Sequence, residues 1–345
     1  MRRIASFFAL SFVLAALVLV PLSWVLYQRF LDSPIEFDEP HLLFKVPPKS
    51  NLHAVSKELG QAGYLDYPRL LVLHARWQKQ AHIQAGDYQF PSGVTPRQLL
   101  AQLNEGDVVQ YSITLVEGKR FRELLQTLHD DPRIQPVLIE KSDQEIITAL
   151  DIDVDALEGW FYPDTYQFVR GTTDRDILLI AFNRTKTVLA EEWSARAEKL
   201  PFDSPYEALI LASIVEKETA VAQERPAIAG VFVRRLQVGM RLQTDPTVIY
   251  GLGDSYDGNL TRAHLAAVTP YNTYRINGLP PTPIAAASRP AIHAVLHPED
   301  HEALFFVAKG DGTHQFSATL EEHNAAVRHY QIEKRSRSYR STPAP

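Results

Sequence analysis

The sequence predicts an α+β protein with a single N-terminal transmembrane helix, a small α+β module and a larger mixed α+β domain. An uninterrupted apolar segment begins the chain, and short alternating segments typical of strands occur among helix patterns with recognisable caps. The length of 345 residues, 45% of them hydrophobic, suffices for one or two ordinary domain cores beyond that segment.

The N-terminal segment is expected to span a membrane. After Arg2 and Arg3, no charged residue occurs from Ile4 to Gln28, and a helix rising about 1.5 Å per residue covers a hydrocarbon core of about 30 Å over that length. A cleaved signal peptide has an apolar core of only about 7–15 residues and a small-residue cleavage site. We therefore expect an uncleaved anchor over residues 1–28, with the N-terminus held in the cytoplasm by the arginines and the bulk of the chain outside it.

The composition excludes several classes of function. The chain has no cysteine, which removes disulfides, thiolate catalysis and Cys-ligated zinc. Its formal net charge is -6, whereas a nucleic-acid-binding protein carries an excess of basic residues. Nucleic acid is therefore not an expected partner.

Residues 29–40 are expected to be a linker, and residues 41–107 a small α+β module. The patterns predict strands and helices in the order strand 42–46, helix 51–62 capped by Ser50, helix 68–79, strand 86–90 and a helix from Thr95 to near Gly106. This element order resembles the LysM-like modules of some cell-wall proteins. A packing module with no ligand of its own remains the alternative.

Residues 108–335 are expected to form the larger domain, followed by a disordered polar tail at 336–345. Apolar and polar residues alternate over 109–115, as in a half-buried strand. The aromatic stretch 158–168 lacks such a period and is predicted to form a wall or loop and not a strand. A strand at 304–308, a turn at 310–312, a returning strand at 313–316 and a helix from about Thr319 complete the domain.

Glu218 is the strongest candidate for a catalytic residue. A helix is expected to start with Ser204 as N-cap and Pro205 as its first residue, and to continue to Ala222. At about 100° per residue, Glu218 falls in the middle of the apolar face and Glu216 on the opposite side. Apolar surroundings disfavour ionisation, so the pKa of Glu218 should be raised, as a general acid requires. A structural pair with a buried arginine is the alternative.

Two polar segments are candidate binding elements. In residues 241–247, Asp245 is expected to cap a short helix that begins at Pro246, which leaves Gln243 and Thr244 free to bind a ligand. Residues 269–281 have no apolar period and are predicted to form a loop rich in hydrogen-bonding groups. Its candidate contacts to a sugar are Tyr271, Asn272, Tyr274 and Asn277.

Four motifs together resemble one family. SIVEKETA around Glu218, RLQTDPTVIYG at 241–251, YNTYRINGLPPTPI at 271–284 and GDGTHQFSATLEEHN at 310–324 are similar to those of membrane-anchored endolytic murein transglycosylases of the YceG-like (MltG) type. The resemblance covers nearly the whole chain. Thr269 departs from the family pattern, in which serine more often precedes Pro-Tyr-Asn.

The resemblance implies cleavage of peptidoglycan strands between MurNAc and GlcNAc, leaving 1,6-anhydro-MurNAc ends and terminating nascent strands. It places the catalytic Glu on Glu218, with Gln243, Thr244, Asp245, Tyr271, Asn272, Tyr274 and Asn277 as substrate contacts. No metal or other cofactor is expected. The expected partners are peptidoglycan strands, the lipid of the inner membrane and peptidoglycan synthases, and the bulk of the chain is then periplasmic.

Other interpretations follow from the same residues. Asp151, Asp153 and Asp155 imitate the start of a calcium loop, but Ala156 stands in place of the required glycine and Tyr162 in place of the bidentate glutamate. His293, His297 and His301 have a spacing of four, but Pro298 ends the helix that a metal site on one face would need. The remaining rivals are a non-catalytic wall-binding scaffold and a hydrolytic muramidase with Asp245 or Glu158 as second carboxylate.

Overall fold

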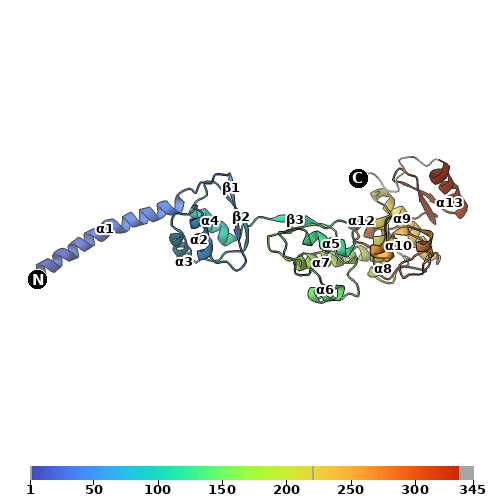
Figure 1. The fold of residues 1–345 in the computed structure, drawn as a ribbon, viewed down its shortest axis with the longest axis horizontal. Coiled ribbons are helices and arrows are strands. Elements are labelled where there is room, and N and C mark those ends of the chain that lie inside the picture. The colour runs from blue at the N-terminus through green and yellow to red at the C-terminus, as the bar shows by residue number, and fades with distance from the viewer. Residues whose placement is uncertain (1, 220, 334–345) are drawn as a thin grey trace. The chain divides into compact units, whose positions relative to one another are not determined.

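The computed structural model describes residues 2–219 and 221–333, with side chains from Leu14 onward. The chain divides into two compact units (Figure 1), one formed by Met1–Tyr111 with Gln167–Thr172 and the other by Ser112–Tyr166 with Thr173–Pro345. Three two-stranded sheets and a larger number of helices make a mixed α+β structure.

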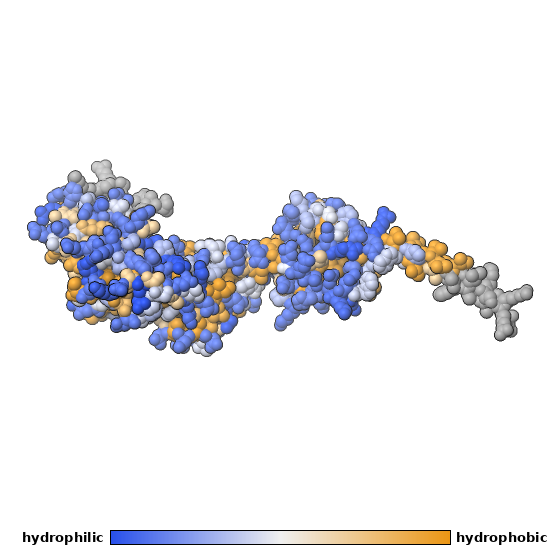
Figure 2. All heavy atoms as spheres, turned by 180° about the vertical axis from the view of Figure 1, so that it is seen from behind, coloured by the Kyte–Doolittle hydropathy of each residue, from blue (hydrophilic) through white to orange (hydrophobic). Residues whose placement is uncertain are grey.

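The first unit begins with a long apolar helix. Helix α1 spans Arg2–Asp32, and its stretch Leu14–Asp32 is long and apolar enough to cross a membrane, a property that a signal sequence would share. Figure 2 shows the hydrophobic residues along the described part of this helix in orange. The end of α1 joins the folded unit, because Leu31 is fully buried and Arg97 Nε lies 2.9 Å from Asp32 Oδ1.

The rest of the first unit is two strands and three helices around one core. The elements are β1 (His41–Val46), α2 (Leu52–Gln61), α3 (Pro68–Trp77), β2 (Gly86–Pro91) and α4 (Pro96–Glu105). Strands β1 and β2 pair antiparallel and place Phe44, Tyr88 and Phe90 in the core. The predicted elements are present, but the N-cap of α2 is Asn51, whose side chain accepts from Ala54 N, and not Ser50.

The second unit is mainly helical. Its elements up to the central helix are α5 (Phe121–His129), α6 (Asp143–Leu150), α7 (Asp174–Ser194) and α8 (Pro205–Glu218). These are followed by α9 (Arg225–Gln237), α10 (Asp245–Leu252), α11 (Arg262–Ala266) and α12 (Arg289–Leu296), with short 3₁₀ turns at Ala222–Glu224 and Gly253–Ser255. Helix α8 packs against α7, α9, α10 and α12 in the core of this unit.

The C-terminal part of the second unit is a hairpin and a helix, as the sequence predicts. Strands β5 (Phe305–Ala308) and β6 (His314–Ser317) pair antiparallel, α13 (Leu320–Val327) follows, and a π-helical turn occupies Arg328–Glu333. The remaining sheet joins β3 (Tyr111–Thr114) to β4 (Thr165–Phe168). The aromatic stretch 158–168 is thus a strand only at its end. The expected tail lies outside the described residues.

Candidate active site

Helix α8 presents Glu218 at its C-terminal end. Ser204 is the N-cap and Pro205 the first residue, as predicted. The helix nevertheless ends at Glu218 and does not continue to Ala222, because Thr219 is extended, with φ -144° and ψ 136°. Every side chain from Ala208 to Glu216 is buried, so α8 is a rigid core element, and the position of its last residue is fixed by packing.

Contrary to the helical wheel, the side of α8 that carries Glu216 is not exposed to solvent. It is buried among other protein atoms, with a side chain only 3% exposed, and its Oε1 accepts from Arg225 at 2.9 Å. Its Oε2 accepts from the backbone N–H of Ser288 at 2.8 Å and from the Ser288 hydroxyl. The structural ion pair that was the alternative for Glu218 therefore occurs at Glu216.

Glu218 is half-buried, and its carboxyl has properties suited to a proton donor. Burial raises its pKa to about 7, and the neighbouring Asp245 charge acts in the same direction. The Thr244 hydroxyl, which donates to Glu218 Oε1, and the charge of Arg235 oppose this rise. The position at the negative end of the α8 dipole also disfavours ionisation. A substantial fraction of Glu218 therefore carries a proton at neutral pH.

Buried threonines hold the partner of Glu218 in place. The backbone N–H of Thr244 donates to Thr273 Oγ1 at 3.0 Å, and the hydroxyls of Thr273 and Thr247 lie 2.8 Å apart. The Thr247 hydroxyl donates to the carbonyl of Thr244 at 2.8 Å. Thr247 and Thr273 connect the start of α10 to the loop beyond α11, and this network fixes the hydroxyl that orients the Glu218 carboxyl.

Glu218 opens into a cavity of about 650 Å³, which we call the acid cavity. The structure brings four of the predicted contact residues to it, namely Gln243, Thr244, Asp245 and Tyr274. The remaining lining includes residues of β5, β6 and α13 that the sequence did not connect to the site, among them Phe305, Phe306, His314, Leu320 and His323. This cavity is a concave site with one proton donor and several neutral hydrogen-bonding groups, as a sugar ligand requires.

Asp245 does not have its predicted capping role, and Gln243 has an unusual backbone conformation. Thr244 is the N-cap of α10 and Asp245 its first residue, so Asp245 is not the cap. The Asp245 carboxylate instead accepts from the Tyr274 hydroxyl at 2.7 Å. Gln243 has φ +49°, in the left-handed region that is uncommon for residues other than glycine. Such strain is typical of functional segments.

Arg235 lines the acid cavity and was not among the residues predicted from the sequence. This arginine of α9 is buried, donates to the carbonyls of Leu304 and Leu242 at 2.7 Å each, and lines the acid cavity. Burial lowers its pKa, which the charges of Tyr274 and Glu218 oppose. Two adjacent arginines, at 234 and 235, follow a hydrophobic run, and one of them must face the core. This pair of arginines after a hydrophobic run was the signal in the sequence that could have identified Arg235.

The other predicted contact residues do not line the acid cavity. Asn272 is fully buried, and its amide donates to the backbone carbonyls of His264, Leu265 and Ala267. Its side-chain oxygen accepts from Tyr274 N, so it organises the loop and has no free group for a sugar. Asn277 Oδ1 accepts from Arg241 Nε at 3.1 Å at the surface.

A second cavity of about 780 Å³ lies in the same unit, and we call it the side cavity. Tyr271 lines this cavity, and its hydroxyl lies 2.8 Å from that of Thr282. Glu158 also lines it, accepting from the backbone N–H of Phe121 at 2.9 Å and from the Tyr250 hydroxyl at 3.3 Å. Burial raises the pKa of Glu158 to about 7. Glu158 and Glu218 thus line different cavities.

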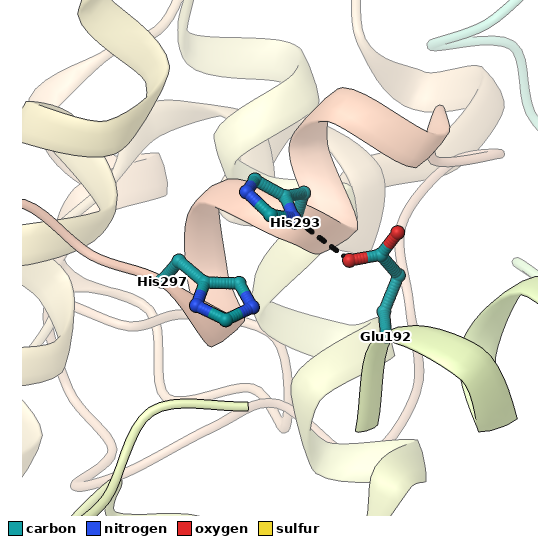
Figure 3. Close-up of side chains that lie close together, drawn as sticks. All are labelled: Glu192, His293 and His297. Carbon is teal, nitrogen blue, oxygen red and sulfur yellow. Dashed lines mark hydrogen bonds and ion pairs between the residues drawn. The ribbon is translucent and has the colours of Figure 1, made fainter. Parts of the chain in front are cut away.

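A cluster of two histidines and a glutamate lies outside both cavity linings (Figure 3). One donor atom each from Glu192, His293 and His297 lie within 4.8 Å of one another. His293 Nδ1 is 2.8 Å from Glu192 Oε2, and Arg289 Nε is 2.6 Å from Glu192 Oε1. Both carboxylate oxygens are therefore engaged, one by a hydrogen bond with His293 and one by an ion pair with Arg289, and these contacts join α7 to α12. His301 is elsewhere, with Nε2 2.9 Å from the carbonyl of Ala227. That the reaction needs no metal stays a prediction.

The raised pKa of Glu218 predicts a pH-dependent effect on stability. In the unfolded chain this carboxyl ionises near its ordinary pKa of 4.5, whereas in the folded chain it keeps its proton up to about pH 7. The contribution of Glu218 to the free energy of unfolding is therefore fully present below pH 4.5, and it is lost as the pH rises from 4.5 to 7. We expect Glu218→Gln to gain on the order of 1–3 kcal/mol relative to the wild type across this window.

Thermal unfolding of both proteins between pH 4 and pH 8 measures this difference. Comparing the two proteins cancels the contribution of other groups with raised pKa values, such as Glu158. A difference in Tm that does not change with pH would show that Glu218 has an ordinary pKa in the folded protein.

Comparisons with known proteins agree with the four motifs. The profile of the YceG-like family matches residues 44–329. A Bacillus subtilis (strain 168) protein called endolytic murein transglycosylase is 28% identical over 323 residues, covering 88% of this chain and 89% of its own length. A Streptococcus pneumoniae (strain ATCC BAA-255 / R6) protein of the same name is 26% identical, over 93% of this chain and 64% of its own length.

A solved structure gives the same result at the level of the fold. The 2.6 Å crystal structure of a yceG-like protein from Listeria monocytogenes is 28% identical and matches with a TM-score of 0.52, covering 83% of this chain and 98% of that one. The match of the family profile extends over well more than half of the 345 residues. The chain therefore belongs to the YceG-like family.

Proposed function

We propose that this protein is an endolytic peptidoglycan transglycosylase that cleaves the glycosidic bond between MurNAc and GlcNAc and leaves a 1,6-anhydro-MurNAc end. The observation that carries the proposal is Glu218, a carboxyl with a pKa of about 7 that opens into a cavity large enough for a sugar. The relatives named endolytic murein transglycosylase supply the class of substrate.

The proposed reaction uses Glu218 twice. Its protonated carboxyl first donates the proton to the glycosidic oxygen while the bond from that oxygen to C1 of MurNAc breaks. The C6 hydroxyl oxygen of the same sugar then bonds to C1, and the Glu218 carboxylate accepts the hydroxyl proton. Glu218 ends the cycle protonated, and no water is consumed.

One carboxyl suffices because the nucleophile belongs to the substrate. Ordinary glycosidases need a second carboxylate as nucleophile or as the base that activates water. An attacking hydroxyl held in the same sugar gains the advantage of an intramolecular reaction, which replaces that second group. The Thr244 hydroxyl orients the Glu218 carboxyl, and Gln243 and Tyr274 are placed to contact the sugar.

The product distinguishes this reaction from hydrolysis. Purified glycan strands digested by the protein should yield MurNAc ends that are lighter by one water than a hydrolysed end. Mass spectrometry of the released fragments measures this. Reducing MurNAc ends would instead establish a muramidase, and strands bound by folded protein but left intact would establish a scaffold.

We further propose that α1 is an uncleaved anchor of the inner membrane and that the rest of the chain lies in the periplasm. The buried Leu31 and the ion pair of Asp32 with Arg97 support this, because they make the end of α1 part of the folded unit. An anchored enzyme stays close to the membrane, where strands are made, so we infer that it terminates nascent strands beside the synthases. The module at residues 41–107 acts in this proposal as a LysM-like wall-binding element.

The proposed orientation can be checked with a single cysteine, since the natural chain has none. Ser341→Cys, which lies outside the described residues, should react with a membrane-impermeant maleimide once the outer membrane is permeabilised. A cysteine inserted directly after Met1, the matched control, should react only after lysis of the inner membrane. The reverse pattern would contradict the topology.

A further inference from the structure

The side cavity is placed to receive a group that is attached to the sugar being cleaved. Lys217 lines both the side cavity and the acid cavity, and it is the residue directly before Glu218. The side chain of Lys217 at the end of α8 is thus common to both linings. A substituent of a sugar bound in the acid cavity is the group that we consider for the side cavity.

Within the part of the chain that the structure describes, two cations of the side cavity form no ion pair. The Lys217 ammonium donates to the carbonyl of Gly118 at 3.1 Å, and the Arg120 guanidinium donates to the carbonyl of Ile249 at 3.3 Å. The Arg120 guanidinium carbon also lies 5.3 Å from the centre of the Tyr250 ring. Across the described residues, no carboxylate oxygen lies within 4.0 Å of the charged nitrogens of Lys217 or Arg120.

Two neighbouring cations, in contrast, each form an ion pair with a carboxylate. Lys119 pairs with Glu123 at 2.8 Å, and Arg122 pairs with Asp143. Among the lining carboxyls, Glu158 has a pKa raised to about 7 by burial, and Asp254 is exposed. Lys217 and Arg120 thus differ from Lys119 and Arg122 in forming no ion pair within the described residues.

The surroundings of Lys217 favour an incoming anion. Burial lowers its pKa, and the charges of Arg120 and Lys119 act in the same direction, while Glu123 opposes them. Its side chain is also positioned by the backbone, because the Gly118 carbonyl accepts from the Lys217 ammonium while the Gly118 N–H donates to the Ala286 carbonyl at 2.8 Å. A ligand carboxylate would accept a charge-assisted hydrogen bond from an ammonium that is already in place.

We propose that the side cavity binds a carboxylate of the peptide carried by MurNAc, so that the enzyme prefers strands bearing peptides over strands from which peptides have been removed. This inference rests on the proposed function. The sugars of the strand carry no charge, whereas the peptide joined to the lactyl group of MurNAc has free carboxylates. Arg120 and Lys217 bind one of these carboxylates, and the rings of Tyr250 and Tyr271 line its path.

Binding to a cleavage-deficient protein tests the proposal without relying on turnover. Full-length Glu218→Gln protein in detergent is titrated with three preparations of the same strands, namely peptide-bearing, stripped of peptides by an amidase, and peptide-bearing with carboxylates converted to amides. We expect the peptide-bearing strands to bind about 10-fold more tightly than the other two, which corresponds to about 1.4 kcal/mol.

Variants then locate the preference. Arg120→Gln or Lys217→Gln is added to the Glu218→Gln protein. Each should reduce the ratio of the affinity for peptide-bearing strands to the affinity for the other two preparations toward one. Arg196→Gln is the matched control, since Arg196 lies at the end of α7 and contacts Trp193, and it should keep the full ratio. Equal affinity for all three preparations, or a ratio that survives both cavity substitutions, would overturn the proposal.

Turnover by the wild-type protein separates this inference from the proposed function. Cleavage of all three preparations at equal rate, with equal binding, would refute the peptide site and leave the transglycosylase in place. Preferential binding of peptide-bearing strands that are never cleaved would support the peptide site and refute the enzyme.

Discussion

Glu218→Gln is expected to fold and to lose glycan cleavage by about 10²- to 10⁴-fold, the usual contribution of general acid–base catalysis. An amide of nearly the same shape keeps an oxygen for the Thr244 hydroxyl, but it neither donates nor accepts the proton in either step. Release of soluble fragments from purified strands measures the loss. Binding of the same strands should persist, because the lining of the acid cavity is otherwise unchanged.

The control for this substitution is Glu198→Gln. Glu198 is exposed, and it follows α7 outside both cavity linings. The same chemical change there should leave cleavage within about two-fold of the wild type, as is usual for surface positions. If Glu218→Gln retained cleavage at the wild-type rate, Glu218 would not be the acid.

The second large effect is expected on stability, from Glu216→Gln. Glu216 accepts hydrogen bonds from Arg225 and from the backbone and hydroxyl of Ser288, and the side chains of the ion pair are 3% and 12% exposed. Removing one charge of a buried pair leaves the other uncompensated, at a cost of about 3–5 kcal/mol. Denaturant unfolding should show this as a lower midpoint with an unchanged slope.

A double substitution separates the lost pair from a general defect of α8. Glu216→Met combined with Arg225→Met removes both charges, and apolar replacement of a whole buried pair is often close to neutral. The double variant should therefore be more stable than Glu216→Gln alone. A Glu216→Gln protein as stable as the wild type would show that the pair with Arg225 contributes nothing to stability.

The beginning of α8 and the special position of Glu218 were predictable because they depend on local signals. A serine cap, a proline at the first position and an apolar sequence specify where the helix starts. Its end depends on tertiary contacts, and the helical pattern continues in the sequence beyond Glu218, where the backbone becomes extended. The burial of Glu216 was not predicted because a helical wheel presumes one solvent face, whereas every side chain of α8 from Ala208 to Glu216 is buried.

The loop at residues 269–281 shows the same limit of prediction from sequence, because tertiary contacts decide which of its polar groups stay free. Residue type identified Asn272 and Tyr274 as hydrogen-bonding groups, but only the folded loop shows that the amide of Asn272 is used by three backbone carbonyls. Pairing of β5 with β6 was predictable from the turn between them. Their place in the lining of the acid cavity was not, since that contact joins segments about 90 residues apart in the chain, as Phe306 and Glu218 are.

Digestion of glycan strands in water enriched in ¹⁸O tests the central claim most directly. In the proposed reaction the oxygen that bonds to C1 is the C6 hydroxyl oxygen of the same MurNAc, so no solvent oxygen enters the product. We predict anhydro-MurNAc ends with no ¹⁸O by mass spectrometry. Incorporation of one ¹⁸O at each new MurNAc end would show that water attacks C1, and would contradict the assignment of Glu218 as the single carboxyl of a transglycosylase.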